Sequence, residues 1–153
     1  MTSQTRAIAR LFDWWEITLS DTLLELLERQ WEIEKTFRPI EAANGFWPQF
    51  ANPDTDFPVD LNDPHAQAFV KDAMFRVAEE MFEAANHLKN RPWKQTQRET
   101  NHGAFHEETA DFTHFYLRYL LIVYGRPQWA LEAIRVQYLA KAEVNHQRAT
   151  EGV

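Results

Sequence analysis

Apolar side chains recur at three- and four-residue steps through most of this 153-residue chain, and that period belongs to α-helices. The longest such segment runs from about Thr5 to Phe37, with apolar side chains at Ile8, Leu11, Phe12, Trp15, Leu19, Leu23, Leu26, Leu27, Trp31 and Ile33. No alternating strand pattern and no Gly-rich phosphate loop is visible in the sequence. The pattern therefore predicts an all-α fold and excludes Rossmann and P-loop architectures.

A Pro-rich stretch follows, from Pro39 to Pro64, and reads PIEAANGFWPQFANPDTDFPVDLNDP. Its prolines predict turns, but it holds too many Phe and Trp residues for a free linker, so we expect an ordered, irregular loop. Asn62 or Asp63 is expected to cap the next helix, because its side-chain oxygen can accept a backbone N–H while Pro64 takes the first helical position. That helix is expected to run to about Leu88.

Two more helices are expected beyond the polar connection KNRPWKQTQRETNHG. The third spans about Phe105 to Tyr124 and stops at Gly125, with Pro127 just beyond it. The fourth begins after Pro127 and runs to about Arg148. The whole chain is thus predicted to form one domain of four main helices, packed as a bundle.

Composition narrows the functional classes. The absence of cysteine excludes thiolate catalysis, iron–sulfur clusters and thiolate zinc sites, and it suits a reducing compartment, so cytoplasm is the expected location. The formal net charge of -7 argues against binding to a nucleic-acid backbone, which requires clustered Lys and Arg side chains. No apolar run has the length of a signal-peptide core or a transmembrane helix, so no membrane partner is expected.

Two acidic pairs stand out on the second and third predicted helices. Glu80 and Glu83 are three positions apart, which puts both side chains on one helix face with Cβ atoms about 5 to 6 Å apart. Glu108 and Asp111 repeat that spacing, 25 positions beyond Glu83. If the two helices are antiparallel neighbours, four carboxylates converge, and their repulsion favours a bound cation. Ligands that are all oxygens favour Mg²⁺ or Mn²⁺ over zinc.

The spacing leaves two alternatives open. Glu79 with Glu83, and Glu107 with Asp111, are also helical neighbours, so spacing does not fix the register of the ligands. A solvated acidic helix face is the other interpretation, and it is the common one for a single E-x-x-E. Large apolar side chains beside both pairs argue against it, namely Met81, Phe82, Phe112 and Phe115.

Three segments in order, EEMFEAANHLKNRPWK, HEETADFTHFYL and YLAKAEVNHQR, resemble segments of the all-α nucleoside triphosphate pyrophosphohydrolases. That superfamily includes the MazG-like enzymes and the dimeric dUTPases, and the first two segments look most like the dUTPase branch. The resemblance implies a metal-dependent enzyme that converts a (deoxy)nucleoside triphosphate to its monophosphate and pyrophosphate. Because the chain is nearer in size to a compact MazG-like unit than to a dimeric dUTPase, dUTP, dCTP and dGTP are all candidate substrates.

The resemblance also implies roles for charged side chains. Mg²⁺ or Mn²⁺ ions that bridge the triphosphate would be held by Glu80, Glu83, Glu108 and Asp111. The metal would neutralise phosphate oxygens and activate the attacking water, whose proton one of these acids or Glu79 would accept. The phosphates would be bound by Lys141, Asn145 and Arg148, which share one helix face, and by Lys94. A solvated helix end is the alternative for the first three, since cations suit a helix C-terminus.

Four further residues match positions near the base. Trp93, His114 and Phe115 correspond to positions that surround the base in the dUTPase branch, and Gln30 corresponds to a Gln that reads it. Aromatic rings stack on purines and pyrimidines alike, so they do not identify the base. Ordinary packing is the alternative for Trp93 and His114, and an exposed polar position is the alternative for Gln30. A compact member of this family needs a second subunit to cover the site, so we expect a homodimer or a dimer of dimers.

Two other functions are compatible with the sequence. A helical interaction protein would use the acids as a solvated surface and its aromatic side chains, six Trp among them, to contact a partner. A dinuclear iron carboxylate bundle would use Asp111 and His114 as a D-x-x-H step. That class needs such a step on each of two helices, and Asn86 stands where a His would have to follow Glu83.

Overall fold

The computed structural model describes the backbone of residues 3–151 and the side chains of residues 22–151. Residues 3–151 form five α-helices, four of them long, and no strand, which confirms the predicted fold class. The helices are α1 (Ser3–Ala43), α2 (Pro53–Asp56), α3 (Pro64–Asn86), α4 (His102–Tyr124) and α5 (Pro127–Glu151), and a short 3₁₀ turn, η1, spans Pro48–Phe50. The expected apolar side chains from Ile8 to Leu19 lie outside the described side chains.

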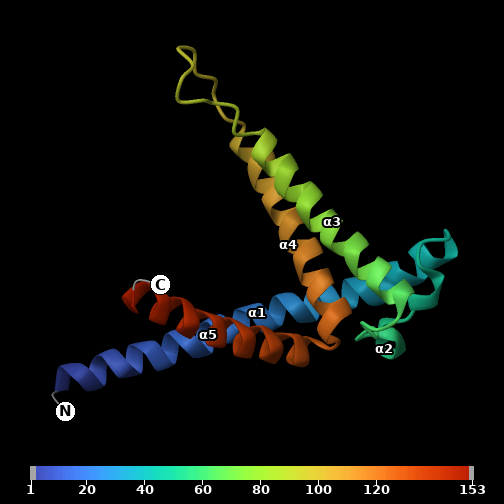
Figure 1. The fold of residues 1–153 in the computed structure, drawn as a ribbon, viewed down its shortest axis with the longest axis horizontal. Helices are drawn as coiled ribbons and strands as arrows, with labels where there is room; N and C mark the ends of the chain where they lie inside the picture. Colours follow the sequence, from blue (N-terminus) through green and yellow to red (C-terminus); the bar gives the residue numbers. More distant parts are fainter. Residues whose placement is uncertain (1–2, 152–153) are drawn as a thin grey trace.

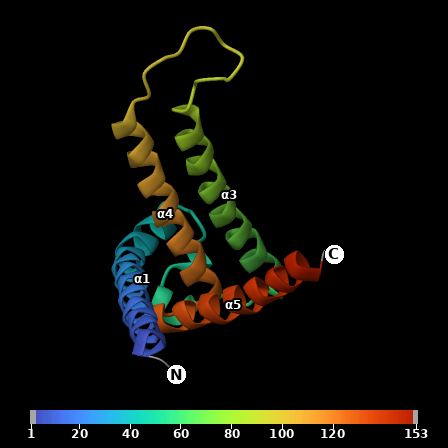
Figure 2. The same ribbon diagram turned by 90° about the vertical axis from the view of Figure 1, so that its left-hand side faces the viewer.

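The long helices form a bundle of two pairs that meet at one end (Figure 1). α3 and α4 run antiparallel and side by side, and they pack more extensively on each other than any other two elements do. α1 and α5 lie across the base of this pair, and the connection 87–101 closes its outer end (Figure 2). No helix in residues 3–151 combines the length and the apolar character needed to cross a membrane.

The core lies where the two helix pairs meet. Its buried apolar side chains come from all four long helices and the Pro-rich segment, and include Leu27, Trp31, Phe57, Phe69, Leu121 and Ala130. In the Pro-rich segment, Phe50 stacks on Phe69 with ring centroids 4.9 Å apart, and Phe57 packs edge-on against Trp31. Burial of these rings offsets the conformational entropy lost by ordering the segment, so the predicted ordered loop is confirmed.

The predicted end of the first helix at Phe37 is wrong. α1 continues six residues further, through Pro39, to Ala43. Proline has no N–H and removes one helical hydrogen bond, but its neighbour Arg38 offsets the loss. The buried Arg38 guanidinium donates hydrogen bonds of 2.8 to 3.1 Å to the backbone carbonyls of Phe46, Trp47 and Phe50. These bonds hold the last turn of α1 against the segment that follows it.

α1 ends two residues before a glycine whose backbone is in a positive-φ, left-handed conformation. Gly45 has φ +89°, and its N–H donates to the carbonyl of Ala42 at 3.0 Å. The N–H of Phe46 donates to the carbonyl of Glu41 at 2.9 Å. This is the hydrogen-bond pattern of a Schellman motif, so Gly45 terminates the helix instead of lying inside the irregular loop.

α3 begins where the sequence predicts, with Asp63 as the capping residue. Asp63 Oδ1 accepts a hydrogen bond from the N–H of His65 at 2.9 Å, and Pro64 occupies the first helical position. α3 ends at Asn86, two residues before the predicted Leu88.

α4 begins at His102, three residues before the predicted Phe105, because Asn101 caps it by accepting a hydrogen bond from the N–H of Ala104 at 3.2 Å. Its end at Tyr124, with Gly125 as the cap, is as predicted. The last helix begins at Pro127 itself rather than after it, and it extends three residues past the expected end to Glu151.

We expect Gly125→Ala to lower the free energy of unfolding by about 1 to 3 kcal/mol. Gly125 has φ +84°, and a Cβ there would lie 2.8 Å from Pro58 Cδ and 3.1 Å from Pro58 N. Gly103→Ala is the matched control, because its Cβ would meet nothing closer than 3.5 Å and alanine favours helix. Urea unfolding measures both variants, and a Gly125→Ala protein as stable as the wild type would contradict this packing.

Candidate functional site

Three carboxylates gather on the outer half of the α3–α4 pair. Glu80 and Glu83 of α3 and Glu108 of α4 each offer one oxygen, and these oxygens all lie within 4.8 Å of one another. Glu83 is exposed, whereas Glu80 and Glu108 are half-buried. No other group of three His, Asp or Glu side chains in residues 22–151 is arranged in this way. The antiparallel packing of α3 on α4 therefore joins acids that are 25 positions apart.

Asp111 adds a fourth negative charge to this acidic cluster. Burial, followed by the charges of Glu83, Asp111, Glu108 and Glu79, raises the pKa of Glu80 above its ordinary value. A raised pKa in a group of carboxylates means that the ionised cluster contains repulsion, which a proton or a cation relieves. The imidazole of His87 borders the same cluster, with Nε2 3.9 Å from Glu108 Oε1.

The donor set fits a hard divalent cation. The converging atoms are carboxylate oxygens supplied by two helices, and Mg²⁺ and Mn²⁺ prefer such ligands. Glu79, an alternative ligand from spacing, instead forms an ion pair of 2.8 Å with Arg76. Neither Glu79 nor Glu107 belongs to the group of converging oxygens, so the geometry favours the register with Glu80, Glu83 and Glu108.

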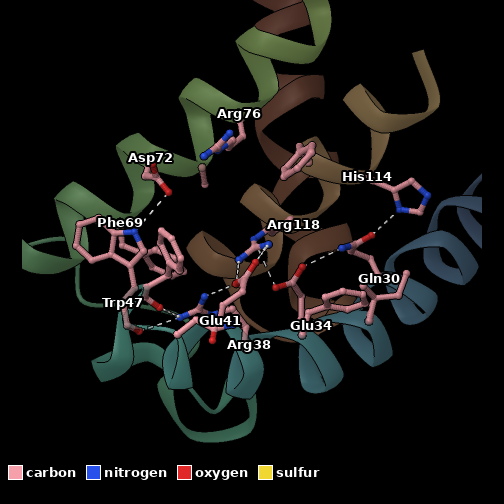
Figure 3. A pocket seen from close by; sticks show the side chains of 16 residues that line it. Gln30, Glu34, Arg38, Glu41, Trp47, Phe69, Asp72, Arg76, His114 and Arg118 are labelled. Atoms are coloured by element: carbon pink, nitrogen blue, oxygen red, sulfur yellow. Dashed lines mark hydrogen bonds and ion pairs between the residues drawn. The ribbon is translucent and has the colours of Figure 1, made fainter. Parts of the chain in front are cut away.

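A pocket of about 650 Å³ lies at the inner half of the same helix pair, between α1, α3 and α4 (Figure 3). Its apolar walls are formed by Ile33, Phe37, Phe46, Trp47, Phe69 and Phe115. Its polar walls include Gln30, Glu34, Arg38, Glu41, Asp72, Arg76, His114 and Arg118. A pocket of this volume that combines aromatic walls with converging polar and charged groups is a candidate small-molecule binding site.

The pocket and the acidic cluster are neighbours along α3 and α4. On α4, Glu108 precedes His114 by six positions, which corresponds to about 9 Å along the helix axis. On α3, the pocket residue Arg76 precedes Glu80 by four positions, or about 6 Å. A ligand whose ring system fills the pocket can therefore reach the acids with a polar tail of that length.

A network of two carboxylates and two guanidinium groups lies at the base of the pocket (Figure 3). Arg118 donates to Glu41 from Nη1 at 2.9 Å and from Nη2 at 2.5 Å, and Arg38 also donates to Glu41. Arg118 Nε lies 3.5 Å from Glu34 Oε2. The Arg38 guanidinium also lies 5.0 Å from the centroid of the Phe69 ring. The four charges balance, which limits the cost of burying them.

The two acids of this network differ in how easily they ionise. Burial raises the pKa of Glu34 above its ordinary value, because the charge of Arg118 and a hydrogen bond from Gln30 only partly offset the loss of solvent. Burial also disfavours the ionised form of Glu41, but hydrogen bonds and charges of Arg118 and then Arg38 outweigh it and lower the pKa of Glu41. Glu41 is thus the more readily ionised of the two acids and the main counter-ion of Arg38 and Arg118.

Helix periodicity alone did not single out Glu34, Arg38, Glu41 and Arg118. A signal was nevertheless present in α1, because Glu34 and Arg38 continue the three- and four-residue steps of the buried Leu27 and Trp31. Charged side chains at core-facing positions of an amphipathic helix must be paired to be tolerated there. Such positions therefore predict a buried ion-pair network, although they do not name the partner on another helix.

Three of the four residues that the sequence associates with the base line this one pocket. Gln30 and His114 lie 84 positions apart, yet Gln30 Oε1 and His114 Nδ1 are 2.9 Å apart. Gln30 Nε2 donates to Glu34 Oε1 at 2.9 Å, and Phe115 lines the same cavity. Gln30 is buried, so the alternative of an exposed polar position is wrong.

Trp93 and Lys94 lie elsewhere, in the connection 87–101 at the outer end of the helix pair. Trp93 is 77% exposed and does not line the pocket. The connection is closed by Asn90, whose Nδ2 donates to the carbonyl of Arg98 and whose Oδ1 accepts from the N–H of Arg98, both at 2.8 Å. Along the helix pair, the acidic cluster lies between this connection and the pocket.

The three polar residues of the last helix are not near the acids within one chain. Lys141, Asn145 and Arg148 belong to residues 135–151, all of which are exposed. This half of α5 projects away from α1, and its C-terminal end is separated from the outer half of α3 and α4 (Figures 1 and 2). A single chain therefore does not bring these side chains to the acidic cluster.

No protein-family model matches this sequence, and comparisons with curated proteins and with solved structures find no match. The comparisons identify no family. The argument for function accordingly depends on the residues and on the geometry of the cluster and the pocket.

Adding Mn²⁺ to the metal-free protein is expected to raise its melting temperature by several degrees, about 5 °C at a hundredfold excess over the dissociation constant. A cation relieves the repulsion among Glu80, Glu83, Glu108 and Asp111 and binds the folded chain only. Differential scanning fluorimetry with and without EDTA measures the shift. Glu83→Gln should lose most of it and Glu107→Gln should retain it; equal shifts in both variants would place the metal elsewhere.

Proposed function

We propose that this protein is a metal-dependent nucleoside triphosphate pyrophosphohydrolase, which converts a deoxynucleoside triphosphate to its monophosphate and pyrophosphate. One observation carries the proposal: a cluster of carboxylates from α3 and α4 lies next to an aromatic pocket in the same helix pair. A nucleotide has the matching shape, with a flat base at one end and a metal-binding triphosphate at the other. The resemblance of three sequence segments to the all-α pyrophosphohydrolases supports the same activity.

In this proposal the aromatic walls bind the base. Phe37 and Phe115 line the pocket together with His114, and rings of this kind stack on bases with offset or edge-on geometry. Stacking of the base would fix the direction in which the phosphates leave the pocket. The phosphates would then extend along the α3–α4 pair toward Glu80 and Glu108.

The acidic cluster would hold the cation. Glu80, Glu83 and Glu108 supply the converging oxygens, and Asp111 lies one turn further along α4. When bound, Mg²⁺ or Mn²⁺ supplies charge neutralisation for the phosphate oxygens and makes water acidic enough to attack phosphorus near neutral pH. Glu79 lies outside the group of converging oxygens and is one candidate to accept the proton of the attacking water.

Arg76 is a phosphate-binding candidate that the sequence patterns did not indicate. Its guanidinium lines the pocket on the side of α3 that leads to Glu80, and it pairs with Glu79 at 2.8 Å (Figure 3). A guanidinium binds phosphate oxygens through paired N–H groups. Arg76 could therefore orient the triphosphate between the pocket and the cation from within the same chain.

The test is a substrate panel. The purified protein is incubated with each common dNTP and Mg²⁺ or Mn²⁺, and the products are separated by anion-exchange chromatography. We expect at least one dNTP to give equal amounts of monophosphate and pyrophosphate. Release of neither product from any dNTP would refute the proposal and favour a helical interaction protein, and diphosphate with orthophosphate would mean that a different bond is cleaved.

We also propose that two copies of the chain associate. α3 exposes Phe75 by 74% and Phe82 by 65%, and α5 exposes Tyr138 by 71%. Large apolar side chains exposed in such numbers mark association surfaces in soluble proteins. A second copy could also supply Lys141 and Arg148 to phosphates that one chain leaves without them.

Light scattering after gel filtration is therefore expected to give at least twice the chain mass of 18.1 kDa at micromolar concentration. Phe82→Glu should shift the protein toward the single-chain mass, because it replaces an exposed aromatic ring of this surface by a charge. A wild-type protein that stays at 18.1 kDa at these concentrations would contradict the association.

A further inference from the structure

One atom at the pocket has no hydrogen-bond partner. Among the buried side-chain nitrogen and oxygen atoms of residues 22–151, only Glu34 Oε2 lacks one. Glu34 is 1% exposed, and its other oxygen accepts from Gln30 Nε2 at 2.9 Å. Arg118 Nε, 3.5 Å away, supplies charge to Oε2 but no hydrogen bond. Because a buried oxygen without a donor is costly, this atom is a place where a ligand donor would be strongly favoured.

The neighbours of Glu34 keep that oxygen available. Gln30 Nε2 donates to Glu34 Oε1, so Gln30 Oε1 must be the atom that faces His114. Gln30 Oε1 then accepts from the Nδ1–H of His114 at 2.9 Å. The amide of Gln30 is thereby held in one orientation by His114. Gln30 acts as a positioning residue for Glu34, and Glu34 is left as the free acceptor at this pocket wall.

The edges of the common bases differ in what they offer to a carboxylate. Guanine presents two adjacent donors, N1–H and the 2-amino group. Adenine and cytosine each pair one amino donor with a ring-nitrogen acceptor, and uracil places its single N–H between two carbonyl oxygens. An acceptor that faces a carboxylate oxygen is repelled, so only guanine satisfies both oxygens of a carboxylate at once.

We propose that Glu34 reads the base and makes this pocket selective for guanine nucleotides. The inference rests on the proposed pyrophosphohydrolase activity for the placement of the triphosphate, but not for the choice of base. The pocket volume of about 650 Å³ is ample for a purine, and Phe37 and Phe115, which line the same pocket as Glu34, offer rings for stacking. Two N–H groups donated to the buried carboxylate favour guanine, because adenine and cytosine offer one N–H and set a ring-nitrogen acceptor against the second carboxylate oxygen, which repels it.

The first experiment uses the wild-type protein with Mg²⁺ and α,β-methylene analogues of the dNTPs, which bind without being cleaved. Isothermal titration calorimetry is expected to give about 10- to 100-fold tighter binding of the dGTP analogue than of the dATP, dCTP or dUTP analogues. The dITP analogue, which keeps N1–H but lacks the 2-amino group, should bind about 10-fold more weakly than the dGTP analogue. Equal affinities, or tightest binding of another base, would overturn the inference.

The second experiment assigns the selectivity to Glu34. Glu34→Gln keeps the shape but replaces one acceptor by a donor, so affinity for the dGTP analogue should fall about 10- to 100-fold while affinity for the dATP analogue does not fall. Glu41→Gln removes a carboxylate of the same network and should leave the ratio of the two affinities unchanged. A ratio that collapses in both variants would assign selectivity to the whole network and overturn the role of Glu34.

The two proposals fail in different ways. Hydrolysis of dNTPs without preference for guanine would refute base recognition by Glu34 but would still agree with the proposed pyrophosphohydrolase activity. Tight, guanine-selective binding without hydrolysis supports the role of Glu34 in base recognition and refutes the proposed pyrophosphohydrolase activity. If Glu34→Gln does not fold, the wild-type comparison of the dGTP and dITP analogues still decides the matter, because it needs no substitution.

Discussion

Glu83→Gln is expected to lower the rate of dNTP hydrolysis by about a thousandfold or more while leaving the helical content unchanged. Glu83 supplies one of the three converging oxygens, and an amide keeps its size but removes its negative charge. The side chain is exposed and takes no part in the core, so the fold should tolerate the change. Steady-state kinetics with saturating Mg²⁺, together with far-UV circular dichroism, measure the two effects.

Glu107→Gln is the matched control. Glu107 is adjacent to Glu108, exposed, and outside the group of converging oxygens, so its loss should change the rate by less than about twofold. Asp111→Asn should also lower the rate, but by less than Glu83→Gln, because Asp111 adds negative charge to the cluster without supplying one of the converging oxygens. A Glu83→Gln or Asp111→Asn enzyme with full activity, or an inactive Glu107→Gln enzyme, would show that the register of the metal ligands is wrong.

Arg38→Met is expected to lower the free energy of unfolding by about 3 to 5 kcal/mol. The guanidinium is buried, binds three backbone carbonyls beyond the end of α1 and pairs with Glu41. Methionine fills the space of the stem but leaves those carbonyl acceptors without a donor, and it removes one of the two guanidinium groups that pair with Glu41. Chemical denaturation followed by circular dichroism measures the loss.

Arg29→Met tests whether this effect comes from burial. Arg29 lies on the same helix and forms an exposed ion pair of 3.2 Å with Glu25, four residues away. Such pairs contribute little, so this variant should be within about 0.5 kcal/mol of the wild type. Equal losses in the two variants would contradict the account of Arg38 as the residue that ties α1 to the Pro-rich segment.

Local signals predicted most of the helical fold. The Asp63–Pro64 start and the Gly125 stop depend on backbone chemistry within a few residues, so the sequence is enough to place them. The end of α1 was mispredicted because Pro39 has a local effect, whereas the contacts of Arg38 that outweigh it come from residues eight to twelve positions further on. A helix rule that considers neighbours alone cannot weigh those contacts.

The same distinction between local signals and contacts distant in the sequence applies to the candidate site. The acids of α3 and α4 were predictable because helical spacing and antiparallel pairing are enough to bring Glu80 and Glu108 together. The buried pair of Glu34 and Arg118 depends on how α1 crosses α4, which no spacing along the chain encodes. Trp93 and Lys141 do not line the pocket, and both are exposed. The roles in base and phosphate binding that the sequence suggests for them would therefore require a second chain.

The most direct test of the proposed activity is ³¹P NMR of dGTP with Mg²⁺ and either the wild-type protein or the Glu83→Gln variant. The account predicts that the wild type converts the triphosphate signals into those of dGMP and pyrophosphate in equal amounts, and that Glu83→Gln leaves them almost unchanged over the same time. Formation of dGDP and orthophosphate, or equal conversion by both proteins, would contradict it.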